Sequence, residues 1–235
     1  MKEQYNLSLN GSGNSSGGVY NNVKIRGEGT ILDDIDCDVF KTYGTSEIQG
    51  NIKTRQVTVF GETKVRKDLH SENVKVYGTL EVGGMAAVTR TKVRGTFDIG
   101  ENFTGEEIDV AGGMNVKGNL EAENFNLNGA CTIIGMLNAG KINIVLRYEH
   151  SNVEEIGGEK ITVRKKSSFF PFSKHGGFLK TRVIEGDEIY LEYTKADVVR
   201  GNNVTIGPGC EISVVEYHES YKNAAQSLVK EYKQI

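Results

Sequence analysis

The sequence predicts an all-β fold: a single-stranded parallel β-helix, or β-solenoid, of 17-residue coils followed by a short C-terminal helix. Two observations predict the solenoid, namely a glycine that recurs at a constant 17-residue interval and apolar residues at fixed distances from it. A third observation, a change to helical spacing after residue 217, predicts the helix. The recurring glycines are Gly27, Gly44, Gly61, Gly78, Gly95, Gly112 and Gly129.

Apolar residues around each glycine fall in three pairs, and the members of a pair are two residues apart. Before Gly61, for example, one pair is Val57 and Val59. A spacing of two places both side chains on one face of a strand. Three pairs in each repeat predict a triangular coil of three short strands. Stacked coils would then form three parallel sheets around one apolar column.

Three parts follow one another along the chain. Residues 1–22, with their run of glycine and serine, predict a flexible tail. Residues 23–216 predict the solenoid, with regular coils over 23–146 and irregular coils over 147–216. Residues 217–235 predict an amphipathic helix, because apolar residues recur there at intervals of 3 or 4. The helical positions are Tyr221, Ala225, Leu228, Tyr232 and Ile235.

The irregular coils differ from the others in two ways. The phase returns two residues late after Leu146, which predicts a lengthened corner up to Ser151. A loop over 164–182 without any period then interrupts the repeat. We expect the 17-residue coil to resume afterwards, because Ile189 and Ile206 are again separated by that interval.

Composition and cysteine usage exclude several classes of protein. The 235 residues carry a net charge of −3, so no overall positive field favours nucleic acid. No apolar run reaches the roughly 18 residues of a transmembrane helix, and the N-terminal residues do not resemble a signal peptide. Cys37, Cys131 and Cys210 are far apart and fall at inward positions, which indicates buried thiols. We therefore expect a cytoplasmic protein.

One family shares this pattern. The glycine- and serine-rich run from Gly11 to Tyr20, the segment from Val23 to Ile31, the triplet from Ile35 to Cys37 and the glycine-marked coils resemble the bactofilins. The likeness is to their Gly/Ser-tailed branch in spore-forming bacteria. It implies a right-handed triangular β-helix, polymerisation without nucleotide, and roles in scaffolding, cell shape or motility. The broken coils after Leu146 depart from that pattern.

No residue pattern predicts a catalytic, cofactor-binding or metal site, so we expect no enzyme, no cofactor and no small-molecule substrate. Neither a Walker loop nor a dinucleotide-binding fingerprint occurs. The alternative enzyme is a left-handed β-helix acyltransferase, because Ile25, Ile31 and Cys37 are six residues apart. The 17-residue period argues against it, as does the lack of a histidine placed as a general base.

The loop over 164–182 is the unusual segment, because it is basic and aromatic and has no acidic residue. Phenylalanines flanked by lysines can insert at a lipid surface while the cations meet anionic headgroups. The loop thus predicts contact with a partner or with the inner face of the cell membrane; alternatively, its phenylalanines fold against the solenoid wall. The residues proposed for this contact are Lys165, Lys166, Phe169, Phe170, Phe172 and Lys174.

The ends of a solenoid expose strand edges and an apolar cross-section, and such edges pair with other chains unless something blocks them. The N-terminal end is predicted to be the more adhesive, because only the flexible tail precedes its first coil. Its interface residues would be Val23, Ile25, Ile31 and Ile35. The predicted function is a non-enzymatic cytoskeletal scaffold that assembles with itself, end to end, into nucleotide-independent filaments. The alternatives are the acyltransferase and a monomeric solenoid adaptor.

Overall fold

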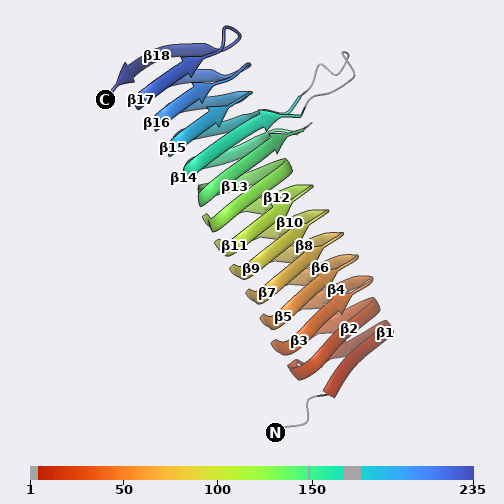
Figure 1. The fold of residues 1–235 in the computed structure, drawn as a ribbon. Helices are drawn as coiled ribbons and strands as arrows, with labels where there is room; N and C mark the ends of the chain where they lie inside the picture. The colour runs from red at the N-terminus through yellow and green to blue at the C-terminus, as the bar shows by residue number, and fades with distance from the viewer. Residues whose placement is uncertain (1–4, 148, 167–175) are drawn as a thin grey trace. The chain divides into compact units, whose positions relative to one another are not determined.

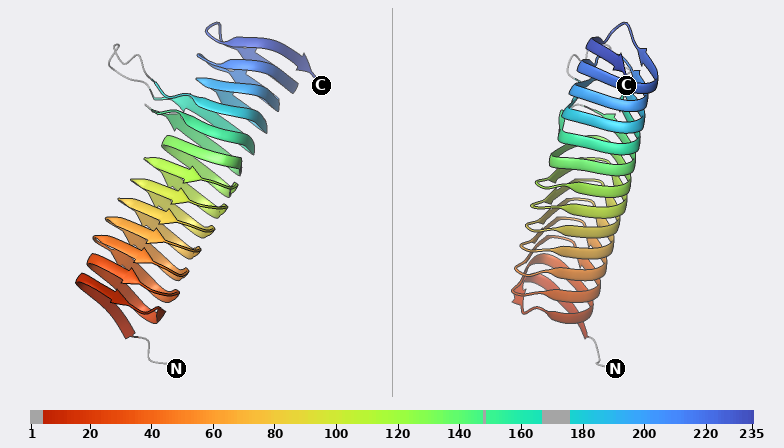
Figure 2. Two further views of the ribbon diagram at one scale, coloured as in Figure 1. Left: turned by 180° about the vertical axis from the view of Figure 1, so that it is seen from behind. Right: turned by 90° about the vertical axis from the view of Figure 1, so that its left-hand side faces the viewer.

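The computed structural model describes residues 5–147, 149–166 and 176–235. The chain divides into two compact units, Met1–Lys117 and Gly118–Ile235. All regular secondary structure among the described residues is β-strand, and within each unit the strands stack coil upon coil (Figures 1 and 2). The paired strands are parallel, for example β3 with β5 and β15 with β16. The predicted all-β parallel solenoid is confirmed.

The described part of unit 1 contains twelve strands, and beyond the first two they alternate between eight and four residues in length. They are β1 (Tyr5–Ser15), β2 (Gly18–Ile31), β3 (Ile35–Thr42), β4 (Thr45–Ile48), β5 (Ile52–Val59), β6 (Glu62–Val65), β7 (Leu69–Val76), β8 (Thr79–Val82), β9 (Ala86–Val93), β10 (Thr96–Ile99), β11 (Phe103–Val110) and β12 (Gly113–Val116).

The apolar pairs found in the sequence form the core of unit 1. Each eight-residue strand carries two inward pairs and the following four-residue strand carries the third, so two strands make the three inward faces of a coil. In β5, Ile52 and Thr54 form one inward pair and Val57 and Val59 the next, all buried. Equivalent positions of successive repeats stack along the unit; for example, Ile52 pairs with Leu69 in β7.

The recurring glycine marks a corner where successive coils touch through their backbones. A Cβ atom on Gly61 would lie 2.1 Å from the carbonyl oxygen of Gly44, and one on Gly78 would lie 2.1 Å from that of Gly61. No side chain fits at such a distance. The 17-residue glycine spacing is therefore a steric requirement of stacking at this corner.

Unit 2 has six strands among its described residues, and the first five have 13 residues or more because regular pairing continues around the corners. They are β13 (Leu120–Leu146), β14 (Ser151–Lys165), β15 (Leu179–Leu191), β16 (Thr194–Ile206), β17 (Glu211–Asn223) and β18 (Leu228–Gln234). Leu137 pairs with Ile156, a 19-residue step that agrees with the lengthened corner after Leu146.

The coil after the loop is shorter than expected. Ile189 pairs with Val204, a 15-residue step, and Ile206 pairs with Leu191. The expectation that Ile189 and Ile206 are neighbours was therefore wrong. Both residues point inward, and a shift of two residues preserves the inward face of a strand. For this reason periodicity in the sequence could not distinguish the two registers.

Both ends of the chain differ from the sequence-based expectation. Tyr5–Ser15 forms β1 where a flexible tail was predicted, and β1 pairs in parallel with β2. The predicted C-terminal helix over 217–235 is wrong, because β17 continues to Asn223 and Leu228–Gln234 forms β18. Leu228 and Tyr232, which are four residues apart, pair instead with Glu211 and Val215 of β17.

Candidate functional site

The predicted N-terminal interface lies inside the core. Val23, Ile25, Ile31 and Ile35 are each exposed by 1% or less. The strand β1 covers the first two, since Leu7 pairs with Val23 and Leu9 with Ile25. The outer layer of this end is thus formed by β1, whose Leu7 and Leu9 are half-buried and whose Tyr5 is 70% exposed.

A signal for β1 exists in the sequence. Tyr5, Leu7 and Leu9 alternate with polar residues at the spacing of a strand. A search at a fixed 17-residue spacing misses this strand, because the pairing of Leu9 with Ile25 is a 16-residue step. The glycines that suggested flexibility occupy stacked positions instead, since Gly11 pairs with Gly27.

The apolar column of unit 2 ends in partly exposed side chains. In β18, Val229 lies above Ile212 and Tyr232 above Val215, and both of these β17 residues are buried core. Tyr232 is nevertheless 62% exposed. Its ring lies 5.0 Å from that of Tyr221, which lies 5.5 Å from that of Tyr217. We call Tyr217, Tyr221, Val229 and Tyr232 the C-terminal end face.

Tyr221 is the most unusual member of the C-terminal end face. Its hydroxyl oxygen is buried and has no hydrogen-bond partner among the described residues. Burial, followed by the neighbouring Tyr232 and Tyr217, raises the pKa of Tyr221. A buried hydroxyl without a hydrogen-bond partner is uncommon in folded proteins.

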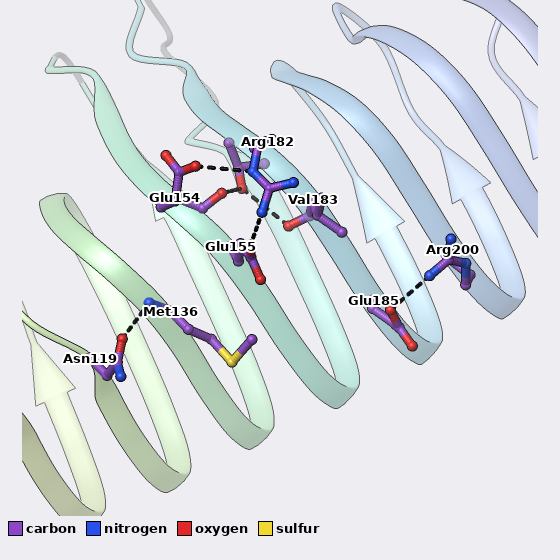
Figure 3. A network of polar contacts seen from close by, with 9 residues as sticks. Asn119, Met136, Glu154, Glu155, Arg182, Val183, Glu185 and Arg200 are labelled. Atoms are coloured by element: carbon purple, nitrogen blue, oxygen red, sulfur yellow. Dashed lines mark hydrogen bonds and ion pairs between the residues drawn. The ribbon is translucent and has the colours of Figure 1, made fainter.

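The side wall of unit 2 is held by polar contacts between successive coils (Figure 3). The guanidinium of Arg182 in β15 pairs with Glu154, at 3.0 Å, and with Glu155, both in β14. At a corner of β13, the side-chain oxygen of Asn119 accepts a 2.9 Å hydrogen bond from the backbone N–H of Met136. These contacts join neighbouring coils.

A row of alternating charge extends from this wall to β18. Glu185, Arg200, Glu216 and Lys233 occupy paired positions in successive strands. Arg200 lies 3.1 Å from Glu185 and 2.7 Å from Glu216, and Lys233 lies 2.8 Å from Glu216. The cations Lys233 and Arg200 lower the pKa of Glu216. The row places opposite charges across the register of β18 on β17.

Only part of the proposed membrane or partner loop is described. Lys165 ends β14, with its Nζ 4.1 Å from the ring centre of Tyr193, and Lys166 donates a backbone hydrogen bond to Leu146. Phe169, Phe170, Phe172 and Lys174 lie outside the described residues. Near the end of the loop, the ring of Phe178 packs on the ring of His150, with their centroids 3.8 Å apart. This phenylalanine therefore lies against the wall of unit 2.

The three cysteines are buried, as the sequence predicted. Burial raises the pKa of Cys131 to about 12 and that of Cys210 to about 11, and it also raises the pKa of Cys37. The thiolate is the reactive form. With a pKa of about 12, only about one Cys131 in ten thousand is ionised at pH 8.

We therefore expect the native thiols to resist Ellman's reagent at pH 8 over minutes, whereas all three react at once in guanidinium chloride. The measurement is the absorbance of released thionitrobenzoate in parallel native and denatured samples. Rapid modification of the native protein would show that the coils around these cysteines open far more often than their burial implies.

The described residues show no grouping of metal-ligating side chains and no histidine pair. No group of three or more His, Cys, Asp or Glu gathers in the described part of the chain. His70, His150 and His218 are exposed and lie on different coils. Because the described residues form no helix, they also contain no helix that could span a membrane.

Two curated proteins are similar to this chain over nearly its whole length. YhbF of Bacillus subtilis (strain 168) is 56% identical over 226 residues, which cover 96% of this chain and 95% of YhbF. YhbE of the same organism is 58% identical over 217 residues, which cover 92% of each chain. Both bear the name of an uncharacterized protein. No family model matches the chain. No solved structure matches it either.

Proposed function

We propose that this chain, which belongs to the same family as YhbF and YhbE of Bacillus subtilis, is a non-enzymatic scaffold protein that assembles with itself end to end. The observation that carries the proposal is the C-terminal end face, where a buried apolar column stops at a tyrosine that is 62% exposed. The bactofilin resemblance points to the same function. Assembly without nucleotide, in the cytoplasm, belongs to this proposal.

The physical basis is the incomplete last coil. Inside unit 2 each coil is covered on both sides, so Ile212 and Val215 in β17 are 1% and 0% exposed. Among the described residues of this unit, β18 pairs with β17 alone, and it contains no proline that would block its outer edge. A strand edge beside an apolar surface favours pairing with another chain. A second copy related by a two-fold axis would cover both edges at once.

A filament needs a second interface, and the outer layer of unit 1 supports one. The half-buried Leu7 and Leu9 in β1 take the place that Val23 and Ile25 were predicted to hold. The right-handed winding that the bactofilin resemblance implies and the 17-residue coil that the glycine spacing predicts are part of the same proposal. Parallel strand connections within one sheet are overwhelmingly right-handed, which supports that hand.

The proposal predicts that Tyr232→Asp abolishes polymers, because it places a charge on the apolar end of the column. Leu228→Lys is the control for a charge in the same strand, since Leu228 is 58% exposed and pairs with the outward Glu211, whose opposite charge the lysine would meet. The measurements are negative-stain electron microscopy and sedimentation velocity without nucleotide. We expect filaments from the parent and the control, and monomers or dimers from Tyr232→Asp.

Three outcomes would contradict the proposal. Filaments of Tyr232→Asp at matched concentration would show that the C-terminal end face is not an interface. A parent that stays monomeric at all concentrations would favour the adaptor. A discrete trimer would favour the acyltransferase-like enzyme.

A further inference from the structure

A ladder of exposed aromatic rings lies on unit 1. Tyr43, Phe60 and Tyr77 each precede a corner glycine, and they are 46%, 49% and 45% exposed. Tyr43 stacks on Phe60 and Phe60 on Tyr77, with ring centroids 5.1 Å apart in both cases and planes inclined by 9° and 7°. The rings therefore cover one another's faces and present their edges to the solvent. Neither the core nor the C-terminal end face uses these side chains.

Cations surround the ladder. Arg26 and Arg94 occupy the same position of the 17-residue repeat as the rings, one repeat before Tyr43 and one repeat after Tyr77. A parallel row two residues upstream contains Lys24, Lys41, Lys75 and Lys92. The Nζ of Lys24 lies 5.4 Å, and the guanidinium carbon of Arg26 5.7 Å, from the ring centre of Tyr43. The basic-aromatic face, as we call it, comprises these three rings and six cations.

Like charges are adjacent on this face. Lys24 pairs in register with Lys41, and Lys75 with Lys92, across neighbouring strands. Directly opposed like charges destabilise a sheet. Lys41, Lys75 and Lys92 have no ion-pair partner in the described part of unit 1, whereas Arg94 pairs with Asp109. At its C-terminal end the row meets Asp109, which is in register with Lys92 but forms its ion pair with Arg94. Lys41 and Lys75 have no carboxylate in register with them.

Three other cations of unit 1 form ion pairs between coils. Arg55 pairs with Asp38 at 2.6 Å, and Lys64 pairs with Glu81 at 2.5 Å. Arg66 likewise pairs with Glu47. Lys41, Lys75 and Lys92 lack such pairs and lie next to other cations, in a chain whose net charge is −3. An anionic partner from outside the unit would relieve the repulsion within the lysine row.

We propose that the basic-aromatic face binds the surface of an anionic phospholipid bilayer. Tyrosine and phenylalanine edges suit the boundary between headgroups and acyl chains, and lysines and arginines beside them attract anionic headgroups. Single-stranded nucleic acid fits less well, because bases stack on open ring faces and these faces are already covered. This binding does not depend on self-assembly, so it stands apart from the proposed scaffold function.

Vesicle flotation tests the charge requirement. The parent is expected to float with phosphatidylglycerol vesicles and to remain at the bottom with phosphatidylcholine vesicles. K75Q/K92Q is expected to weaken the partition coefficient about 30-fold, since each lysine near an anionic surface contributes about fivefold. The matched control K53Q/K67Q removes two exposed lysines of unit 1 that lie outside the lysine row. Its partition coefficient should fall only several-fold, because the net charge of the chain becomes more negative.

A single tryptophan tests the contact itself, because the natural chain has none. The emission of Phe60→Trp should shift to the blue with phosphatidylglycerol vesicles and should stay unchanged with phosphatidylcholine vesicles. Leu32→Trp places the probe at another corner, where Leu32 is 58% exposed, and should not shift with either. Both measurements are repeated with Tyr232→Asp, so that a failure of self-assembly is not mistaken for a failure of lipid binding.

Several results would overturn the proposal. Equal flotation of K75Q/K92Q and K53Q/K67Q would show that the lysine row makes no specific contribution to lipid binding. Flotation of Phe60→Trp without an emission shift would place the lipid contact elsewhere. A shift that appears with single-stranded DNA but not with vesicles would assign the face to nucleic acid. A shift that depends only on protein concentration would assign it to a second copy.

Discussion

Gly61→Ala is expected to lower the free energy of unfolding of unit 1 by about 3 kcal/mol or more, the range of mutations that force backbone strain. The added Cβ would lie 2.1 Å from the carbonyl oxygen of Gly44, and backbone at this point cannot move without shifting the neighbouring coil. In a solenoid such a disturbance spreads to adjacent coils, because each coil is stabilised mainly by its neighbours. We expect the melting temperature to fall by about 10 °C.

Gly113→Ala is the matched control, because it is the same substitution in the same unit. A Cβ on Gly113 would lie 3.6 Å from the nearest atom, in the side chain of Thr96, which is ordinary contact. The measurements are thermal unfolding by circular dichroism and native-state hydrogen exchange, since a repeat array need not unfold in two states. Equal effects of the two variants would show that the corner glycines are not required for stacking.

Ile25→Lys is expected to unfold the first coils of unit 1 in addition to preventing assembly. Ile25 is 0% exposed, and its paired neighbours Leu9 and Thr42 carry no charge. An unpaired ammonium in such a place costs about 3–5 kcal/mol, as when one partner of a buried ion pair is removed. The chain can avoid this cost by detaching β1 and the start of β2, which would return Ile25 to water.

Hydrogen exchange distinguishes this local unfolding from the loss of an interface. Amides of residues 5–31 should exchange quickly in Ile25→Lys and slowly in Glu28→Lys, which places the same new side chain at an exposed position of the same coil. Slow exchange in both variants would show that the core tolerates the charge. If Ile25→Lys loses polymers through unfolding, as expected, it cannot identify the N-terminal interface.

The sequence by itself determined the inward side chains of the solenoid. Residues such as Val57 and Val59 alternate with polar neighbours, and that alternation is a local property of a strand that any partner strand must respect. The 17-residue glycine follows from an equally local rule, because a side chain cannot occupy the corner where Gly44 and Gly61 meet. Burial of the three cysteines follows from the same alternation.

The basic-aromatic face was also present in the sequence. Tyr43, Phe60 and Tyr77 share one position of the repeat, and lysines share another. The apolar inward pattern does not reveal them, because these side chains point outward. Their significance depends on stacking, since only paired coils place the rings 5.1 Å apart and oppose Lys75 to Lys92.

Only the tertiary structure decided the register between neighbouring coils at the ends of the chain and after the loop over 164–182. The 16-residue step from Leu9 to Ile25 and the 15-residue step from Ile189 to Val204 preserve inward alternation as well as a 17-residue step does. Helical spacing in residues 217–235 was likewise overridden, because β17 offers β18 a backbone edge and an apolar layer. Local pattern fixes which side chains face the core, but the partner of each strand is set by the backbone hydrogen bonds and the layer that the neighbouring coil supplies.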